Sequence, residues 1–232
     1  ANPITILVKR RAALGDTVMS TGVVRELYKQ HDGKCNITVE TENPLVYKNN
    51  PYIADLRNWG EVNSSDYDVV YNLDDAYELN PIEHYVKNYF YRAFGDVNLN
   101  RSVELFPSAE DKTAVDADLA DIMDKFIVVH MRNWHWPAKN ITMDVWLEVY
   151  TKLFTERSDF KVVCVGGPTD FYIEDHPLFV DLRGKYNSRQ LKYLCDHARC
   201  FVGIDSGPFQ CAAASDTHII GLFTHLRPEC VM

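Results

Sequence analysis

A carboxylate stands at a strand-to-helix turn near the start of this 232-residue chain. Residues 4–8 are apolar and β-branched, as in a buried strand, and a helix is predicted at 18–30. Gly15, Asp16 and Thr17 lie between them, at the edge where open α/β sheets bind ligands. Asp16 can act there as a general base, or it can simply cap the helix, because Asp is a favoured N-cap residue.

A second turn of this kind follows the strand-like residues 200–204. Asp205 comes first, Ser206 and Gly207 suit a helix cap, and Pro208 suits the first helical position. The start of a helix presents unpaired N–H groups at the positive end of the helix dipole, where a diphosphate is stabilised. The same residues also fit an ordinary strand-to-helix turn, because tight Gly turns are common there.

Strand-like and helix-like segments alternate along the chain, which is typical of an α/β fold with parallel sheets. The strands are short and apolar on both faces, as expected where helices cover both sides of a sheet. The predicted strands are residues 4–8, 36–39, 68–71, 126–130, 161–165, 200–204 and 218–223. The predicted helices are residues 18–30, 81–94, 109–124, 143–156, 188–198 and 208–215.

A new strand–helix series begins after the segment 105–111, which predicts a domain boundary there. We expect two Rossmann-like domains, residues 1–108 and residues 109–232, whose parallel sheets face a central cleft. One continuous sheet is the alternative.

The composition indicates a folded protein, since 46% of the residues are hydrophobic and 12% are aromatic. No apolar run approaches the roughly 18 residues of a membrane span, and no export signal is visible, so we expect a cytoplasmic protein.

The six cysteines are scattered without zinc-site spacing. A net charge of −9 disfavours a broad nucleic-acid surface. A local basic pocket remains open, with the candidates Arg10, Arg11, Arg132, Lys139 and Arg227.

Several separated blocks of the sequence resemble glycosyltransferase family 9, the heptosyltransferase-like enzymes with GT-B architecture. The blocks occur in the family's order and cover both halves of the chain. They are residues 11–27 with Gly15-Asp16, residues 49–53, residues 130–146 with Lys139, and residues 182–223 with the run Gly203-Ile204-Asp205-Ser206-Gly207-Pro208. The resemblance implies a GT-B fold with an acceptor-side first domain and a donor-binding second domain.

The resemblance also implies roles for single residues. Asp16 corresponds to the catalytic carboxylate that takes the proton of the acceptor hydroxyl, and Lys139 to the lysine that neutralises the departing nucleotide. Asp205 is expected to orient its loop or contact a hydroxyl, because like charges repel it from phosphate. The donor-binding candidates are Arg132, Asp205, Ser206, Gly207, Pro208 and Gln210, and the acceptor-side loop candidates are Gly15 and Thr17. No metal ligand and no cofactor are expected.

Two departures from the family pattern stand out. Gln210 occupies a position where the family often has a histidine that contacts phosphate. The chain also reaches Met232 without the C-terminal helices of family members, so we expect either a longer natural protein or a shortened member.

Two other segments are candidates for contacts with substrates. Trp134, His135 and Trp136 can stack on a base or a sugar, or pack against the domain edge. Residues 78–89 are rich in tyrosine and predicted to be helical on the acceptor side, with His84 as a helix residue and not a catalyst.

The expected function is therefore an inverting, metal-independent transfer of a heptose or related sugar. The donor is a nucleotide sugar, expected to be ADP-linked, and the acceptor is a glycan such as lipopolysaccharide core. Peripheral contact with the inner face of the membrane is compatible with this function, whereas a nucleic-acid partner is disfavoured. The alternatives are a sugar-nucleotide epimerase or hydrolase, and a non-catalytic nucleotide-sugar-binding module.

Overall fold

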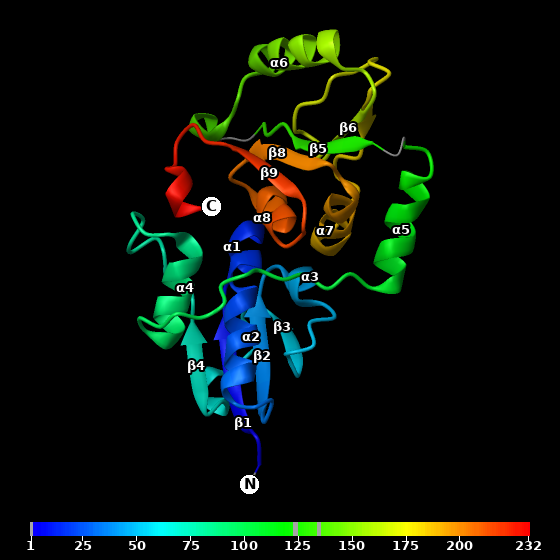
Figure 1. The fold of residues 1–232 in the computed structure, drawn as a ribbon. Coiled ribbons are helices and arrows are strands. Elements are labelled where there is room, and N and C mark those ends of the chain that lie inside the picture. The colour runs from blue at the N-terminus through cyan, green and yellow to red at the C-terminus, as the bar shows by residue number, and fades with distance from the viewer. Residues whose placement is uncertain (1, 123–124, 134–135) are drawn as a thin grey trace. The chain divides into compact units, whose positions relative to one another are not determined.

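The computed structural model describes residues 2–122, 125–133 and 136–232. The chain divides into two compact units. Unit 1 comprises the chain up to Phe106 together with Pro228–Met232, and unit 2 comprises Pro107–Arg227. Each unit is described by itself below, and Figure 1 labels their elements.

Unit 1 is built on a parallel four-stranded sheet with the strand order β3-β2-β1-β4. Its strands are β1 (Ile4–Lys9), β2 (Cys35–Thr41), β3 (Asp55–Asn58) and β4 (Val69–Asn72). Its α-helices are α1 (Leu14–Met19), α2 (Thr21–Gln30), α3 (Pro44–Tyr47) and α4 (Tyr85–Phe94), and its 3-10 turns are Ser64–Asp66 and Pro228–Cys230.

Unit 2 contains a parallel five-stranded sheet with the order β7-β6-β5-β8-β9. Its strands are β5 (Phe126–His130), β6 (Lys161–Cys164), β7 (Phe179–Asp181), β8 (Cys200–Ile204) and β9 (His218–Leu222). Its helices are α5 (Ala109–Leu119), α6 (Met143–Glu156), α7 (Ser188–His197) and α8 (Gly207–Ala213), with a 3-10 turn at Pro137–Lys139.

The central strands are buried on both faces, as their composition predicts. Ile6, Leu7 and Val8 of β1 are successive residues whose side chains alternate between the faces, and none has any exposed surface. The parallel α/β fold with two Rossmann-like sheets predicted from the sequence is confirmed.

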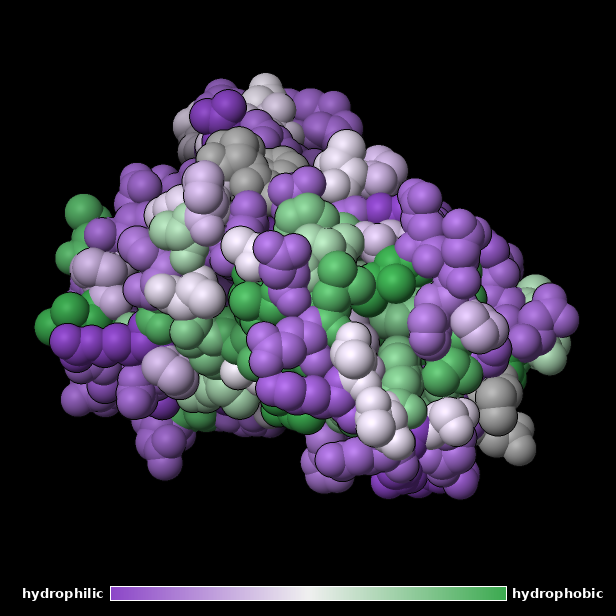
Figure 2. All heavy atoms as spheres, turned by 90° about the horizontal axis from the view of Figure 1, so that it is seen from above, coloured by the Kyte–Doolittle hydropathy of each residue, from purple (hydrophilic) through white to green (hydrophobic). Residues whose placement is uncertain are grey.

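Hydrophobic residues also reach the surface of unit 2. α6 exposes Val145, Leu147 and Val149. Figure 2 looks down on the side where α6 lies uppermost in Figure 1, and shows hydrophobic residues interspersed with hydrophilic ones there. Within the described part of the chain, every helix is too short or too polar to cross a membrane.

Several predicted elements differ in the structure. The helix predicted at 18–30 begins earlier and is divided at Ser20, whose hydroxyl donates to the Thr17 carbonyl at 2.7 Å. The helix predicted from Pro81 begins only at Tyr85, because His84 caps it by accepting from the Val86 amide. The edge strands β3 and β7 were not predicted.

Composition explains why these two strands escaped the prediction. β3 has the polar sequence Asp-Leu-Arg-Asn and β7 has only three residues. Their strand conformation depends on backbone pairing with β2 and β6, and a single sequence does not encode such pairing locally. The predicted helix at 109–124 ends at Leu119, and its last two predicted residues lie outside the described residues.

A buried ion pair joins α5 to α7 inside unit 2. Arg189 Nε donates to Asp111 Oδ2 at 2.8 Å. Asp111 also accepts from the Ser108 amide at 3.0 Å and from the Asn187 side chain at 3.1 Å. Burial by itself raises the pKa of the Asp111 carboxyl, but the bonds from Arg189 and the two cap residues outweigh it and lower the pKa to about 2.

We predict that Asp111→Asn destabilises the protein by about 3 kcal/mol, because it removes the carboxylate charge from a buried ion pair. In the native protein, the contribution of Asp111 is fully present above its unfolded pKa of about 4 and is lost as the pH falls toward 2. Urea unfolding between pH 2 and pH 7 measures both effects.

Asp159→Asn is the matched control, since Asp159 pairs with Arg157 on the exposed surface at 2.9 Å. This variant should unfold almost like the native protein. Equal losses in both variants would contradict the structural role assigned to the buried pair.

Candidate functional site

In both units, polar side chains collect where the order of the strands reverses. In unit 2 the chain leaves β5 toward β6 on one side and later returns to place β8 on the other. In unit 1 the chain leaves β1 toward β2 on one side and later returns to place β4 on the other side of β1. Open parallel sheets bind ligands at such switch points, outside the carboxyl ends of the strands.

An ion pair occupies the switch point of unit 2. Lys139 Nζ lies 2.6 Å from Asp205 Oδ2, and both side chains are mostly buried. Lys139 belongs to the segment after β5, and Asp205 directly follows β8. The pairing of these neighbouring strands therefore brings together two residues that are 66 positions apart.

Arg132 approaches the same turn from the end of β5. Its Nη1 donates to the Asp205 carbonyl at 3.1 Å. Burial lowers the pKa of Arg132, and the nearby carboxylates of Asp205 and Asp170 counteract this effect. Lys139 and Arg132 thus present two cationic groups around one acidic turn.

Ser206 caps helix α8, as predicted from the sequence. Its Oγ accepts from the Phe209 amide at 3.3 Å and lies 2.9 Å from the Ile204 carbonyl, to which it can donate. Gly207 and Pro208 form the first turn of the helix. The turn is thus held by its own hydroxyl.

His130 and Asp170 support this cap from behind. His130, the last residue of β5, pairs in register with Gly203 of β8, which brings its ring to Ser206. His130 Nδ1 lies 3.0 Å from Ser206 Oγ, and Nε2 lies 2.9 Å from Asp170 Oδ2. Both His130 and Asp170 are buried.

Asp170 is held as a carboxylate by several donors. Burial raises the pKa of Asp170, but hydrogen bonds from His130 and from the backbone amides of Asn133 and Gly167 outweigh burial and lower it. The Asn133 amide donates to Oδ1 at 2.8 Å and the Gly167 amide to Oδ2 at 2.7 Å. Asp170 thereby ties the loop after β6 to the loop after β5.

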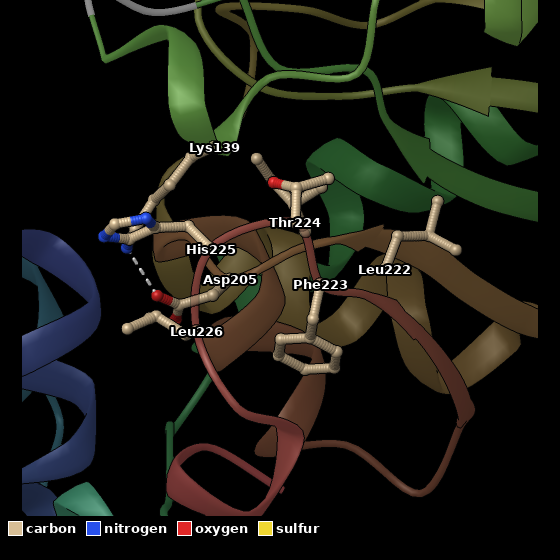
Figure 3. A pocket seen from close by; sticks show the side chains of 8 residues that line it. Lys139, Asp205, Leu222, Phe223, Thr224, His225 and Leu226 are labelled. Atoms are coloured by element: carbon tan, nitrogen blue, oxygen red, sulfur yellow. Dashed lines mark hydrogen bonds and ion pairs between the residues drawn. The ribbon is translucent and has the colours of Figure 1, made fainter. Parts of the chain in front are cut away.

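A pocket lies beside the Lys139–Asp205 pair (Figure 3). Its wall is completed by the segment after β9, with Thr224, His225 and Leu226. The Trp136 ring lies 5.3 Å from the His225 ring and 5.1 Å from Lys139 Nζ. Of the predicted aromatic cluster, Trp136 thus adjoins the pair, whereas Trp134 and His135 lie outside the described residues.

Gln210 is buried within helix α8. Its Nε2 has no hydrogen-bond partner among the described residues. A contact between this amide and a phosphate stays a prediction.

In unit 1, Asp16 stands at the switch point and both oxygens of its carboxylate have partners. It is the third residue of α1 and not the N-cap, which is Ala13. Its Oδ2 accepts from the Ala13 amide at 2.9 Å, and its Oδ1 lies 3.1 Å from Arg10 Nη2. Asp16 therefore caps the helix from inside it and is also paired with a buried arginine.

Three carboxylates surround the Arg10 guanidinium. Besides Asp16, it contacts Glu78 at 3.0 Å and Asp74 at 3.6 Å. Arg11 pairs separately with Glu42. The first-unit arginines of the proposed basic pocket are thus occupied by acidic partners.

Two tyrosines complete the surroundings of Asp16. The Tyr89 hydroxyl donates to Asp16 Oδ1 at 3.3 Å, and Tyr77 also hydrogen-bonds to Asp16. Burial and the neighbouring Asp16 charge raise the pKa of both tyrosines, so both remain neutral donors. Gly15 and Thr17 flank this carboxylate in α1, and the Thr17 hydroxyl donates to the Ala13 carbonyl.

The sequence did not predict that Arg10 pairs with Asp16, and it indicated no role for His130 or Asp170. The position of His130 at the end of a predicted strand was an available signal. Asp170 gave none, because it lies in a loop 40 residues further along the chain.

The family profile of Glycosyltransferase family 9 (heptosyltransferase) matches residues 58–231. The chain belongs to this family. Family membership makes it a glycosyltransferase, and confirms the resemblance seen in the sequence. No protein with a curated description matches the chain by sequence.

Solved structures of family 9 and of other heptosyltransferases share the fold. A glycosyl transferase family 9 protein from Veillonella parvula has a TM-score of 0.78 at 16% identity, over 97% of this chain and 83% of its own. The E. coli ADP-heptose LPS heptosyltransferase II has a TM-score of 0.74 at 18% identity, over 95% of this chain and 85% of its own.

A third similar structure is the dodecameric iron-containing heptosyltransferase TibC from enterotoxigenic E. coli, in complex with ADP-D-beta-D-heptose. Its TM-score is 0.70 at 15% identity, over 95% of this chain and 59% of its own. In the present family member, the described residues contain no group of three or more His, Cys, Asp or Glu residues suited to hold a metal ion.

We predict that Gly166→Ala disrupts the support behind Ser206. Gly166 has a φ of +122°, and an added Cβ would contact Asp170 Oδ2 and lie 2.6 Å from the His130 ring. The expected cost is roughly 3 kcal/mol in the free energy of unfolding, measured by urea titration.

The adjacent Gly167→Ala is the control, because its Cβ would lie 3.7 Å from Asp170 Oδ2 at an ordinary contact distance. It should change stability by less than about 0.5 kcal/mol. Similar values for the two variants would show that the space around Asp170 is not constrained.

Proposed function

We propose that this family 9 member transfers a heptose or related sugar from an ADP-linked donor to a hydroxyl of a glycan such as lipopolysaccharide core. The observation that carries the proposal is the convergence of Lys139 and Arg132 on the Asp205 turn, at the switch point of unit 2. The similar structures named for ADP-heptose support the choice of donor.

The donor diphosphate would bind at this turn. Lys139 and Arg132 are the cations that offset its charge, and the backbone amides of Ser206 and Gly207 are the proposed hydrogen-bond donors. Pro208, which has no N–H, contributes by fixing the first turn of α8. Asp205 holds Lys139 at this position until the diphosphate competes for it. The charge that develops as the anomeric C–O bond breaks leaves with the nucleotide and is stabilised by the same cations.

Asp16 is the proposed general base of unit 1. The acceptor oxygen forms a bond to the anomeric carbon and its proton passes to the Asp16 carboxylate. The bond from the anomeric carbon to the diphosphate oxygen breaks, and its electron pair leaves with the nucleotide. This single displacement inverts the anomeric configuration. When Asp16 becomes neutral, Arg10 retains Asp74 and Glu78 as partners, so proton uptake leaves no buried charge unpaired.

The proposal includes catalysis without a metal or other cofactor, because Lys139 and Arg132 offer the positive charge that a divalent cation supplies elsewhere. It also includes a cytoplasmic location, with peripheral contact to the inner face of the membrane where a lipid-linked acceptor would be presented.

We predict that Asp16→Asn lowers the transfer rate by a factor of about 10² to 10⁴, the usual contribution of a general base. The amide keeps the shape of the side chain but cannot take the proton. Binding of ADP, measured by calorimetry, should stay nearly unchanged.

Asp74→Asn is the matched control, since Asp74 also faces Arg10 but is not the proposed base. Its transfer rate should stay within a few-fold of the native value. Native transfer by Asp16→Asn would reject Asp16 as the base.

For the donor side, we predict that Lys139→Ala weakens ADP binding about 10- to 100-fold, as expected for a charge-assisted contact to phosphate. Calorimetry with ADP measures the change. Lys152→Ala removes an exposed lysine of α6 that pairs with Glu148 one turn earlier in the same helix, and this variant should bind ADP normally. An unaltered affinity in Lys139→Ala would assign this lysine to the protein surface.

A further inference from the structure

We propose that His130, oriented by Asp170, is a positioning residue that holds the Ser206 cap and thereby keeps residues 205–208 in the conformation that binds a diphosphate. The inference rests on the proposed function for its ligand, but its geometry lies entirely within unit 2. It gives a role to two buried residues that the transfer mechanism does not use.

The first support is the continuity of the polar chain. Asp170 lies 2.9 Å from one ring nitrogen of His130, and the other ring nitrogen lies 3.0 Å from Ser206 Oγ. Asp170 comes from the loop after β6, His130 from the end of β5, and Ser206 from the turn after β8, and these three strands are neighbours in the sheet. The chain therefore connects three adjacent loops at the switch point.

The second support is the number of hydrogens that the hydrogen-bonded series Asp170–His130–Ser206 has to share. A neutral His130 that donates to the Asp170 carboxylate from Nε2 must accept at Nδ1, and among the described residues the Ser206 hydroxyl is the donor placed there. Ser206 then gives up its bond to the Ile204 carbonyl. When His130 carries both protons, it donates to Ser206, and the hydroxyl keeps Ile204. In either form, His130 determines where the Ser206 hydrogen points.

The third support is the lack of free space around the imidazole. A Cβ on Gly203 would lie 3.3 Å from the His130 Cβ and 2.9 Å from the Phe201 ring. A Cβ on Gly166 would lie 2.6 Å from Cδ2 of the His130 ring. Both positions therefore need glycine to leave room for the His130 side chain.

An Asp–His–Ser chain also suggests a nucleophilic serine, but the contacts argue against that function. Ser206 Oγ accepts from the Phe209 amide, as the cap of α8, and lies within bonding distance of the Ile204 carbonyl. A nucleophile needs a hydroxyl oxygen that is free to approach a substrate. The hydroxyl of Ser206 is committed to the helix start, so positioning explains it better.

Two conservative substitutions separate positioning from simple packing. His130→Asn places an amide nitrogen where Nδ1 stands, close to Ser206. His130→Gln places its amide where Nε2 stands, close to Asp170. His130→Ala removes both contacts, and all three variants are compared with the native chain by calorimetry with ADP.

We expect His130→Ala and His130→Gln to weaken ADP binding about tenfold, and His130→Asn to remain within about threefold of the native chain. This split follows from the contact with Ser206, which only the Asn variant retains. A packing role would instead favour the larger Gln over Asn. Equal affinities in all four proteins, or a better rescue by Gln, would overturn the positioning role.

Hydrogen exchange at the Phe209 amide, followed by NMR, tests the cap without any ligand. Exchange should be at least tenfold faster in His130→Ala than in His130→Asn, because the bond to Ser206 Oγ loosens. Native-like exchange in His130→Ala would overturn the inference. If the native chain fails to bind ADP while exchange follows this order, the donor assignment fails and the positioning of Ser206 stands.

Discussion

The hydrogen bond between His130 and Asp170 is the constraint on which the second unit's site depends. Both side chains are buried, and a buried polar group without a partner costs about 1–3 kcal/mol, so the two must remain together. Their pairing ties the loop after β6 to the end of β5, and through Ser206 to the start of α8. Asp205, which pairs with Lys139, is the residue directly before the Ser206 cap.

The parallel sheets explain why these residues meet. In a parallel sheet, the carboxyl ends of all strands lie along one edge, so the residues that follow β5, β6 and β8 are neighbours in space. The middle residues of the central strands, such as Ile6, Leu7 and Val8 of β1, are apolar and fully buried. The polar groups of the candidate site therefore gather at that edge of the sheet, where the strand order reverses.

Unit 1 also gathers polar side chains at its switch point, but there the negative charges outnumber the positive ones. The unit 2 turn combines two cations with one carboxylate, whereas Arg10 in unit 1 serves three carboxylates. A proton acceptor and a diphosphate site need such different surroundings, because excess negative charge suits the first and excess positive charge the second. This contrast agrees with the separate roles proposed for Asp16 and Lys139.

The sequence by itself determined the parallel α/β class, most of the strands, the cap at Ser206 and the family, because hydrophobic period, turn residues and motifs are local signals. The edge strand β3 needed β2 as its pairing partner and was not predictable from the sequence. Only the tertiary structure decided that Asp16 faces Arg10 and that Asp170 reaches His130. His130 and Asp170 follow different strands, β5 and β6, and strand pairing, unlike helix periodicity, depends on the whole folded sheet. Arg10 and Asp16 both follow β1, and their contact depends on how the chain turns between β1 and α1.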